Sequence, residues 1–244
     1  MRIIKDILYG TLDVKRHGLN IYLPDEVEEA DVLIFFHGGG MVAGDKEGEP
    51  ITRLTDLGKV VISANYRMYP DAAYPDFIED AAMAVNWVKE HIQEYVKMKK
   101  LFVGGGSAGA YLTAMLAYDK RYLNKYGIKT TDINGYLIDS GQVTTHMSIL
   151  TERGMDSRQI VVDEAAPVYH VNKNTEFPNI MVVLTDNDWP GRLEQNMMFI
   201  KTLEIFGCPK EKITYKMIKG FKHGKYGHTD EYIYAVKDFM DTSL

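Results

Sequence analysis

The chain has 244 residues, of which 45% are hydrophobic and 25% charged, a composition typical of a globular protein and unlike that of a disordered one. Its 28 Lys plus Arg against 34 Asp plus Glu give a net charge of −6, which argues against nucleic acid as a partner. Cys208 is the single cysteine, so an intrachain disulfide is excluded. With no run of ~20 apolar residues and no signal-like N-terminus, we expect a cytoplasmic protein without a membrane span.

Short apolar runs rich in β-branched residues predict the strands. In chain order these runs cover residues 31–36, 59–66, 100–105, 133–139, 179–185 and 212–218. Runs that are almost continuously apolar are typical of strands buried on both faces of a sheet. Before residue 31 the pattern is weaker, and we expect residues 14–24 to form an antiparallel edge strand.

Longer segments between these runs have the spacing of helices. They cover residues 75–96 and 189–207, and a final helix is expected after Thr229 as its cap. Alternation of strands and helices predicts an α/β fold: a mostly parallel central sheet flanked by helices, in a single domain over residues 1–244. Residues 141–178 contain no predicted strand and are too long for an ordinary loop, which predicts a short lid or insertion over the site.

One serine lies among small residues where a predicted strand meets a predicted helix. Gly105-Gly106-Ser107-Ala108-Gly109 fits the pattern G-x-S-x-G, in which a sharp turn leaves the serine hydroxyl exposed as a nucleophile. A glycine-rich phosphate loop is the alternative, because the same stretch also fits G-x-G-x-x-G. That pattern is weak on its own, and here it lies in mid-chain, outside the first strand-helix unit.

A second glycine-rich motif, His37-Gly38-Gly39-Gly40, follows the strand predicted over 31–36. Its glycines allow the N–H groups of Gly39 and Gly40 to face a developing oxyanion, with the N–H of Ala108 on the other side. Together the two motifs resemble those of the α/β-hydrolase superfamily, especially the hormone-sensitive-lipase-like or acetyl-esterase-type carboxylesterases with HGGG and GxSAG signatures. The resemblance implies an α/β-hydrolase fold and a serine hydrolase that acts on carboxylic esters.

Two further segments extend the resemblance. Residues 65–88 are similar to the stretch after the fourth strand in that family, which implies that Arg67 and Asp80 form a structural pair supporting the oxyanion loop. Only 36 residues precede His37, so we expect the long N-terminal cap of these esterases to be lacking. Residues 163–171 instead resemble capless relatives, including carbohydrate acetyl esterases, feruloyl esterases and kynurenine formamidases.

The acid and the base of a catalytic triad are expected beyond the serine, in the order that this fold uses. Asp186 and Asp188 both follow the strand over 179–185, and the family's loop pattern favours Asp188, with Asp186 as a turn former. His223 lies between the last predicted strand and the last helix, followed by glycine as in the common His-Gly form. We favour it over His228, which adjoins the predicted helix cap.

The prediction is therefore a serine carboxylesterase that hydrolyses short-chain acyl esters through an acyl-enzyme, with acetylated or hydroxycinnamoylated carbohydrates among its candidate substrates. The catalytic residues would be Ser107, Asp188 and His223. The candidate substrate-binding residues are His146, Tyr169 and Trp189. No residue spacing suits a metal site and the triad needs no cofactor, so we predict neither.

The expected partner is a small-molecule ester, without nucleic acid or membrane, and a homo-oligomer is left open. Two other functions stay open as well. A formamide or amide hydrolase of the kynurenine formamidase type would use the same triad. A ligand-binding homologue without catalysis is the third option, and the presence of serine, aspartate and histidine candidates argues against it.

Overall fold

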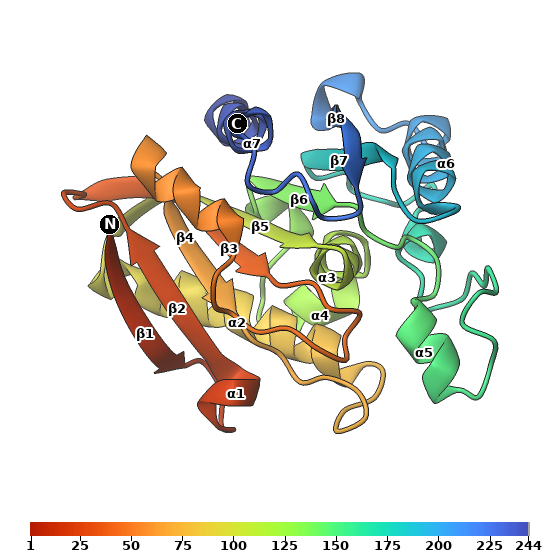
Figure 1. Cartoon of the computed structure of the whole chain (residues 1–244), viewed down its shortest axis with the longest axis horizontal. Coiled ribbons are helices and arrows are strands. Elements are labelled where there is room, and N and C mark those ends of the chain that lie inside the picture. Colours follow the sequence, from red (N-terminus) through yellow and green to blue (C-terminus); the bar gives the residue numbers. More distant parts are fainter. Residues whose placement is uncertain (244) are drawn as a thin grey trace.

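The computed structural model describes residues 1–243, which are built around one twisted sheet (Figure 1). The strands follow the order β1-β2-β4-β3-β5-β6-β7-β8. Their bounds are β1 Arg2–Leu8, β2 Gly18–Leu23, β3 Glu29–Phe36, β4 Val60–Ala64, β5 Lys97–Gly106, β6 Gly135–Asp139, β7 Ile180–Asn187 and β8 Ile213–Lys222. From β4 to β8 every neighbouring pair is parallel, while β2 pairs antiparallel with both β1 and β4. This confirms the predicted mostly parallel α/β architecture.

The N-terminal edge of the sheet differs from the prediction for residues 14–24. Val14–His17 form a short helix, α1, whose start is capped by the side chain of Asp13. Only Gly18–Leu23 are extended, and this strand is buried between two neighbours, so the expectation of an edge strand here was wrong. β1 is the edge strand at this end of the sheet. It pairs with the side of the buried, apolar β2 that does not face β4.

The helices predicted over residues 75–96 and 189–207, after Ser107 and after Thr229 are all present, and the structure adds shorter ones. The α-helices after α1 are α2 Asp76–His91, α3 Ala108–Tyr118, α4 Lys120–Asn124, α5 Met147–Glu152, α6 Arg192–Ile205 and α7 Asp230–Thr242. Short 3-10 helices are η1 Pro50–Leu57, η2 Ile92–Glu94, η3 Thr130–Asp132, η4 Pro167–His170 and η5 Lys210–Lys212. As expected, Thr229 caps α7: its side chain accepts a hydrogen bond from the backbone N–H of Tyr232 at 3.3 Å.

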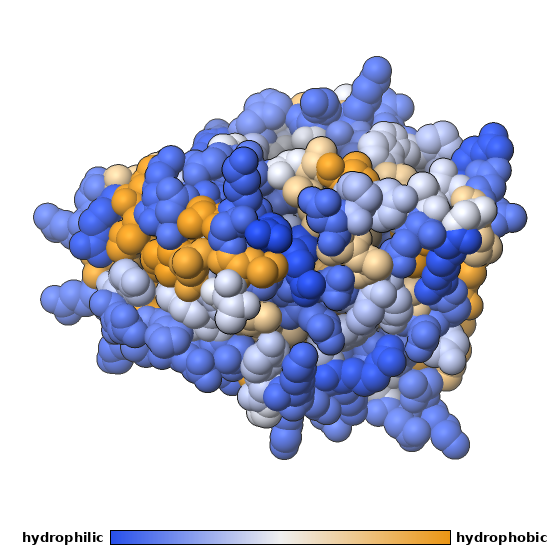
Figure 2. Space-filling view, turned by 90° about the horizontal axis from the view of Figure 1, so that it is seen from below, coloured by the Kyte–Doolittle hydropathy of each residue, from blue (hydrophilic) through white to orange (hydrophobic). Residues whose placement is uncertain are grey.

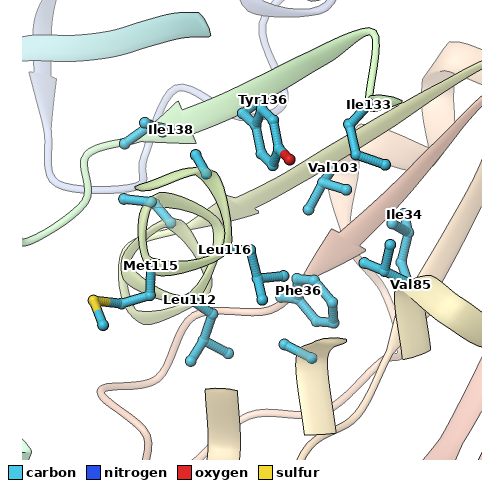
Figure 3. Close-up of a cluster of buried hydrophobic side chains, with 14 of the residues drawn as sticks. Ile34, Phe36, Val85, Val103, Leu112, Met115, Leu116, Ile133, Tyr136 and Ile138 are labelled. Carbon is cyan, nitrogen blue, oxygen red and sulfur yellow. The ribbon is translucent and has the colours of Figure 1, made fainter. Parts of the chain in front are cut away.

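The hydrophobic core lies in two layers, one on each face of the sheet. In Figure 1, α7 lies above the sheet and α2 below it. Alternate residues of β3 supply both layers: Ile34 and Phe36 pack with α2 and α3, and Leu33 and Phe35 pack with η1 and α7. Figure 3 shows the first layer, where side chains of α3 meet those of β3, β5 and β6. Every residue of α3 is buried, so the helix that follows Ser107 is held from all sides.

The surface seen in Figure 2 is mostly hydrophilic, with an apolar area on the side where Figure 1 draws β1 and β2. On β1, Ile3 and Leu8 keep 41% and 49% of their surface exposed. Within residues 1–243 no helix has both the length and the apolar character that crossing a membrane requires. The exposed large hydrophobic side chains of the sheet thus lie on its two edge strands, β1 and β8, where Tyr215 is 40% exposed.

The segment predicted as a lid or insertion, residues 141–178, connects β6 to β7 and contains α5 and η4. Several hydrogen bonds tie it to the rest of the fold, and two of them lie near the glycine-rich motifs. The hydroxyl of Ser148 donates to the carbonyl oxygen of Gly40, and the hydroxyl of Tyr111 donates to that of Ala165 at 2.7 Å. These bonds place α5 beside the HGGG loop and the second half of the segment against α3.

Candidate active site

The turn around Ser107 explains why glycine is needed on both sides of it. Ser107 has φ 54° and ψ −108°, a strained conformation for a residue with a side chain. A Cβ on Gly109 would lie 1.9 Å from the carbonyl oxygen of Phe36, and one on Gly105 would lie 2.3 Å from the backbone of Gly109. Only glycine fits where these backbones approach so closely. The Ser107 N–H donates to the Asp139 carbonyl at 2.8 Å, which fixes the turn to β6.

Ser107, His223 and Asp188 form a continuous hydrogen-bonded chain. The Oγ of Ser107 lies 2.8 Å from Nε2 of His223, and Nδ1 of His223 lies 2.5 Å from Oδ1 of Asp188. Because Asp188 accepts from Nδ1–H, Nε2 is left to accept the serine proton. Burial opposes ionisation of Asp188, but the hydrogen bond and the charge of His223 outweigh it, and the pKa of Asp188 is lowered.

Trp189 stabilises the position of the histidine. Its ring stacks on that of His223 with centroids 3.9 Å apart and planes 17° apart, and the backbone N–H of Trp189 donates to Oδ1 of Asp188 at 2.7 Å. Trp189 also lines the cavity beside Ser107, which is where substrate would bind. The structure therefore brings together the predicted nucleophile, base, acid and one of the predicted substrate-binding residues.

The HGGG loop places two free backbone donors next to the serine. Gly39 and Gly40 have φ of 102° and 65°, a region that favours glycine, and both line the cavity with Ser107. Within residues 1–243, neither N–H donates a hydrogen bond, whereas the carbonyl of Gly39 accepts from Val42 and Ala43. Ala108 is the first residue of α3, where N–H groups have no partner inside the helix. These three N–H groups are available to an oxyanion.

A buried tyrosine holds the start of the HGGG loop. The ring of Tyr66 stacks on His37 at 4.5 Å, and its hydroxyl donates to the His37 carbonyl at 2.9 Å. The next residue, Arg67, donates from Nε and Nη2 to the two carboxylate oxygens of Asp80 at 2.8 and 2.7 Å. Arg67 and Asp80 thus pair with each other away from Ser107, at the base of the segment that supports the loop.

The two rival residues lie elsewhere. Asp186 accepts a hydrogen bond from the N–H of Gly220 at 2.7 Å and so joins β7 to β8. His228 lies next to the cap of α7, where its carbonyl oxygen accepts from the guanidinium of Arg53. Neither side chain is bonded to Ser107 or to His223.

The cavity at Ser107 has a volume of about 460 Å³ and is mainly apolar. Besides the residues above, its walls contain Phe35, Val42, Glu49, Pro50, Ile51, Asp139, Ser140, Met147 and Tyr232. Sequence reasoning did not find these residues. One signal was present for Asp139. It is the last residue of a buried strand, and sites in α/β folds form at the C-terminal ends of the strands. Among residues 1–243, no group of three or more His, Cys, Asp and Glu is arranged to hold a metal ion.

Two of these walls carry acidic groups with altered ionisation. Burial raises the pKa of Asp139 to about 6, although hydrogen bonds from the hydroxyls of Tyr226 and Tyr232 oppose the rise. Burial, together with the charges of Asp139 and Asp45, raises the pKa of Glu49 to about 7. Near neutral pH the cavity therefore contains a carboxyl group that is only partly ionised.

Two of the predicted substrate-binding residues, His146 and Tyr169, lie outside the walls of this cavity. His146 is buried and its Nδ1 accepts from the N–H of Ser148 at 3.2 Å, so it caps α5, and burial lowers its pKa to about 3. Tyr169 is 56% exposed on η4. Neither residue lines the cavity beside Ser107. Met147, the residue after the cap, is the one that this segment contributes to the cavity.

Comparisons with known proteins identify similar families and folds. The BD-FAE family model matches residues 19–133, the part of the chain that contains the HGGG loop and Ser107. Esterase LipI of Mycobacterium tuberculosis is 36% identical over 111 residues, which is 43% of this chain and 35% of LipI. The probable carboxylic ester hydrolase LipM of the same organism is 34% identical over 119 residues, 46% of this chain and 27% of LipM. The chain spans about a third of the length of these curated relatives.

Solved structures extend the similarity to the whole chain. A truncated form of a carbohydrate esterase from gut microbiota has a TM-score of 0.81 and 19% identity, covering 99% of this chain and 95% of that one. Esterase B from Lactobacillus rhamnosis has a TM-score of 0.78 and 19% identity, covering 99% and 84%. At this identity the likeness concerns the fold, so the chain has the α/β-hydrolase fold of these esterases. The match to the BD-FAE family concerns residues 19–133, the part that carries the serine.

Proposed function

We propose that the protein is a serine carboxylesterase that hydrolyses short-chain esters through an acyl-enzyme intermediate. The observation that carries the proposal is the hydrogen-bonded chain from Ser107 through His223 to Asp188, open to a cavity with free backbone donors. The curated proteins similar to this chain carry the names of esterases and carboxylic ester hydrolases, which supports the same class.

In the first half of the reaction, Ser107 Oγ would attack the ester carbonyl carbon while its proton moves to Nε2 of His223. The carbonyl oxygen then becomes an oxyanion, and the N–H groups of Gly39, Gly40 and Ala108 would donate to it. Asp188 holds the imidazole in the correct tautomer and stabilises its positive charge. When the tetrahedral intermediate collapses, His223 returns the proton to the leaving alkoxide, the ester C–O bond breaks and the acyl group stays on Ser107.

The second half repeats these steps with water. His223 would take a proton from a water molecule as the water oxygen attacks the acyl carbon, and the same backbone donors would hold the oxyanion. Collapse breaks the bond between Oγ and the acyl group, and the proton on Nε2 returns to Ser107. The products are an alcohol and a carboxylic acid, and no redox partner is needed.

The experiment that tests the proposal compares the wild type with Ser107→Ala and with Ser157→Ala, which removes a serine from the exposed loop after α5. The wild type and Ser157→Ala should hydrolyse nitrophenyl acetate and butyrate and react with a fluorophosphonate probe. Ser107→Ala should lose labelling and about four orders of magnitude or more in kcat/KM, because only binding and oxyanion stabilisation remain. Near-normal turnover by a folded Ser107→Ala protein would reject the proposal.

The same assays distinguish ester hydrolysis from the amide chemistry that one triad also supports. N-formylkynurenine measured beside the esters, at equal enzyme concentration, gives the ratio of the two kcat/KM values. If this ratio favours the formamide, the protein is an amide hydrolase that uses the same triad. A wild type that binds the esters without turnover or probe labelling would indicate a ligand-binding homologue instead.

A further inference from the structure

Glu49 has an unusual position among the residues around the cavity. It directly precedes η1, but its carboxylate makes no hydrogen bond to that helix. Its backbone carbonyl accepts from the N–H and the hydroxyl of Thr52 at 3.1 and 2.8 Å, which fixes the main chain. Among residues 1–243 the carboxyl group has no hydrogen bond or ion pair, and the side chain lines the cavity.

The other carboxyl and hydroxyl groups around the cavity are already occupied. Asp139 accepts from two tyrosine hydroxyls, one of which belongs to Tyr232. Ser140 is bonded to the hydroxyl of Tyr226 at 2.7 Å, and Ser107 is bonded to His223. No Lys or Arg is among the lining residues. Glu49 is therefore the acidic group of the cavity that is free to interact with a ligand, and no cationic side chain there offsets its charge.

We propose that Glu49 is a specificity-determining residue: it accepts a hydrogen bond from a hydroxyl group of the substrate and disfavours substrates that carry a carboxylate. This inference rests on the proposed esterase function and goes beyond it by naming the substrate chemistry and the residue that selects it. The hydroxyl can belong to the acyl part or to the alcohol part of the ester, and the experiment below separates the two.

A hydroxyl is the partner that suits this group better than an ammonium ion. With a pKa of about 7, the carboxyl is a mixture of acid and carboxylate near neutrality. A hydroxyl can donate to the carboxylate and can also accept from the acid, whereas an ammonium ion interacts well only with the carboxylate. The titratable groups that surround Glu49 are Asp45 in its own loop, Tyr66 after β4, Asp139 at the end of β6, His223 after β8 and Tyr232 on α7.

The first test uses matched pairs of esters and three variants. On the alcohol side the pair is hydroxyethyl butyrate and propyl butyrate, and on the acyl side it is the nitrophenyl esters of β-hydroxybutyrate and isovalerate. The variants are Glu49→Met, which removes the acceptor, Glu49→Gln, which keeps an acceptor without the charge, and Asp56→Asn as the control. Asp56 is an exposed acid on the same helix, η1, and does not line the cavity.

The quantity measured is the ratio of kcat/KM values within a pair. In the wild type we expect the hydroxylated member to be preferred in at least one pair. Glu49→Met should reduce that preference by about tenfold or more, Glu49→Gln by no more than about threefold, and Asp56→Asn should leave it unchanged. The pair in which the preference is lost identifies the part of the substrate that Glu49 contacts.

The second test separates recognition by Glu49 from a merely structural role. It follows the kcat/KM ratio of isobutyl butyrate to carboxymethyl butyrate, an uncharged and an anionic ester of similar shape, from pH 5.5 to 8.5. Because both substrates use the same triad, its titration cancels in the ratio. As Glu49 loses its proton around pH 7, the wild-type ratio should rise, since the carboxylate repels the anionic ester. In Glu49→Gln the ratio should stay flat.

The inference is overturned if Glu49→Met keeps the wild-type ratios in both hydroxyl pairs, or if the pH dependence of the anion ratio is the same in wild type and Glu49→Gln. Both results leave the esterase proposal intact, because they are ratios measured on an active enzyme. A wild type without hydrolysis of any of these esters rejects the esterase proposal, and the inference that rests on it is rejected with it.

Discussion

Ser107 and the glycines around it illustrate how single residues determine the site. The turn brings the backbone of α3 against the end of β3, and at Gly109 even a methyl group would overlap with a carbonyl oxygen. At Gly106, by contrast, an added Cβ would be 3.7 Å from its nearest neighbour, the ring of Phe35, which is an ordinary contact. Neighbouring glycines in one motif therefore have different importance.

From this difference we predict that Gly109→Ala is strongly destabilising and Gly106→Ala is not. The alanine at position 109 must displace backbone atoms, which we expect to cost about 3 kcal/mol or more of unfolding free energy, whereas Gly106→Ala should change it by less than about 1 kcal/mol. Urea unfolding followed by circular dichroism measures both. Equal stability of the two variants would contradict the crowding argument.

A second prediction at the residue scale concerns the acid and the base. His223→Ala and Asp188→Asn should lower kcat by several orders of magnitude, because the first removes the proton acceptor of Ser107 and the second alters the tautomer of the imidazole. His228→Ala and Asp186→Asn are the matched controls, since neither side chain is bonded to the triad. Steady-state kinetics on nitrophenyl butyrate decides the matter, and a larger effect in either control would transfer that role to the neighbouring residue.

The residues that the sequence predicted and those it missed differ in a physical way. Ser107, Gly39 and Gly40 are recognisable because close backbone approach and positive φ restrict the choice of residue at those positions. Glu49 carries no such restriction: it is a carboxyl in a loop, and only the folded chain shows that it faces the cavity. The place of His146 in the segment over 141–178 predicts contact with substrate, but the side chain is buried and caps α5 by accepting from the N–H of Ser148.

At the scale of elements, a buried carboxylate connects three segments that are distant in sequence. Asp80 on α2 is fully buried and accepts from Arg67, which follows β4. Its Oδ1 also lies 3.2 Å from Nε2 of His17, the last residue of α1. α1, α2 and the segment that supports the HGGG loop thus meet at one side chain.

We therefore predict that Asp80→Ala destabilises the fold and disturbs the site at a distance. Leaving the partly buried Arg67 without its partner should cost roughly 3 kcal/mol of unfolding free energy. It should also lower kcat/KM, because the segment that holds the HGGG loop loses its anchor. Glu90→Ala, an exposed position on the same helix, should change stability by less than about 0.5 kcal/mol. Thermal unfolding and esterase assays of both variants provide the comparison, and a harmless Asp80→Ala would refute this account.

The elements themselves were predictable where the signal is local. Buried parallel strands are almost continuously apolar, so β3 to β8 could be located from short runs of sequence. The place of β2 in the sheet could not be predicted in this way. It depends on pairing with β1 and with β4, and β4 lies about 40 residues further along the chain. The helical turn at Val14–His17 was also missed, since four polar-rich residues are too few for a periodic pattern.

The whole molecule determines the size of the site, because the cavity is enclosed by segments from both halves of the chain. Phe35, Ile51 and Met147 are apolar walls that come from three separate regions. A cavity of about 460 Å³ offers limited apolar surface beyond the serine. Additional methylene groups stabilise a bound substrate only when protein covers them, by about 0.8 kcal/mol each.

We expect activity to be highest on acetyl to butyryl esters and to fall for acyl chains of about eight carbons or more. A series of nitrophenyl esters, measured as kcat/KM at concentrations below the solubility of the longest member, checks this. Val42 borders the cavity and is 56% exposed, so Val42→Ala serves as a variant that opens the wall further. If kcat/KM instead increases up to the longest acyl chain, the size of the cavity does not restrict the acyl group.

The strand order of the sheet has a consequence for how the site can change over time. Two strand intervals separate β5, which leads to the serine, from β7, which leads to the aspartate, a distance of about 9 to 10 Å set by backbone hydrogen bonding alone. The sheet therefore fixes the separation of the two backbone segments that lead to the serine and to the aspartate. The loops that form the cavity walls can therefore change to fit new substrates while the spacing of β5 and β7 stays the same.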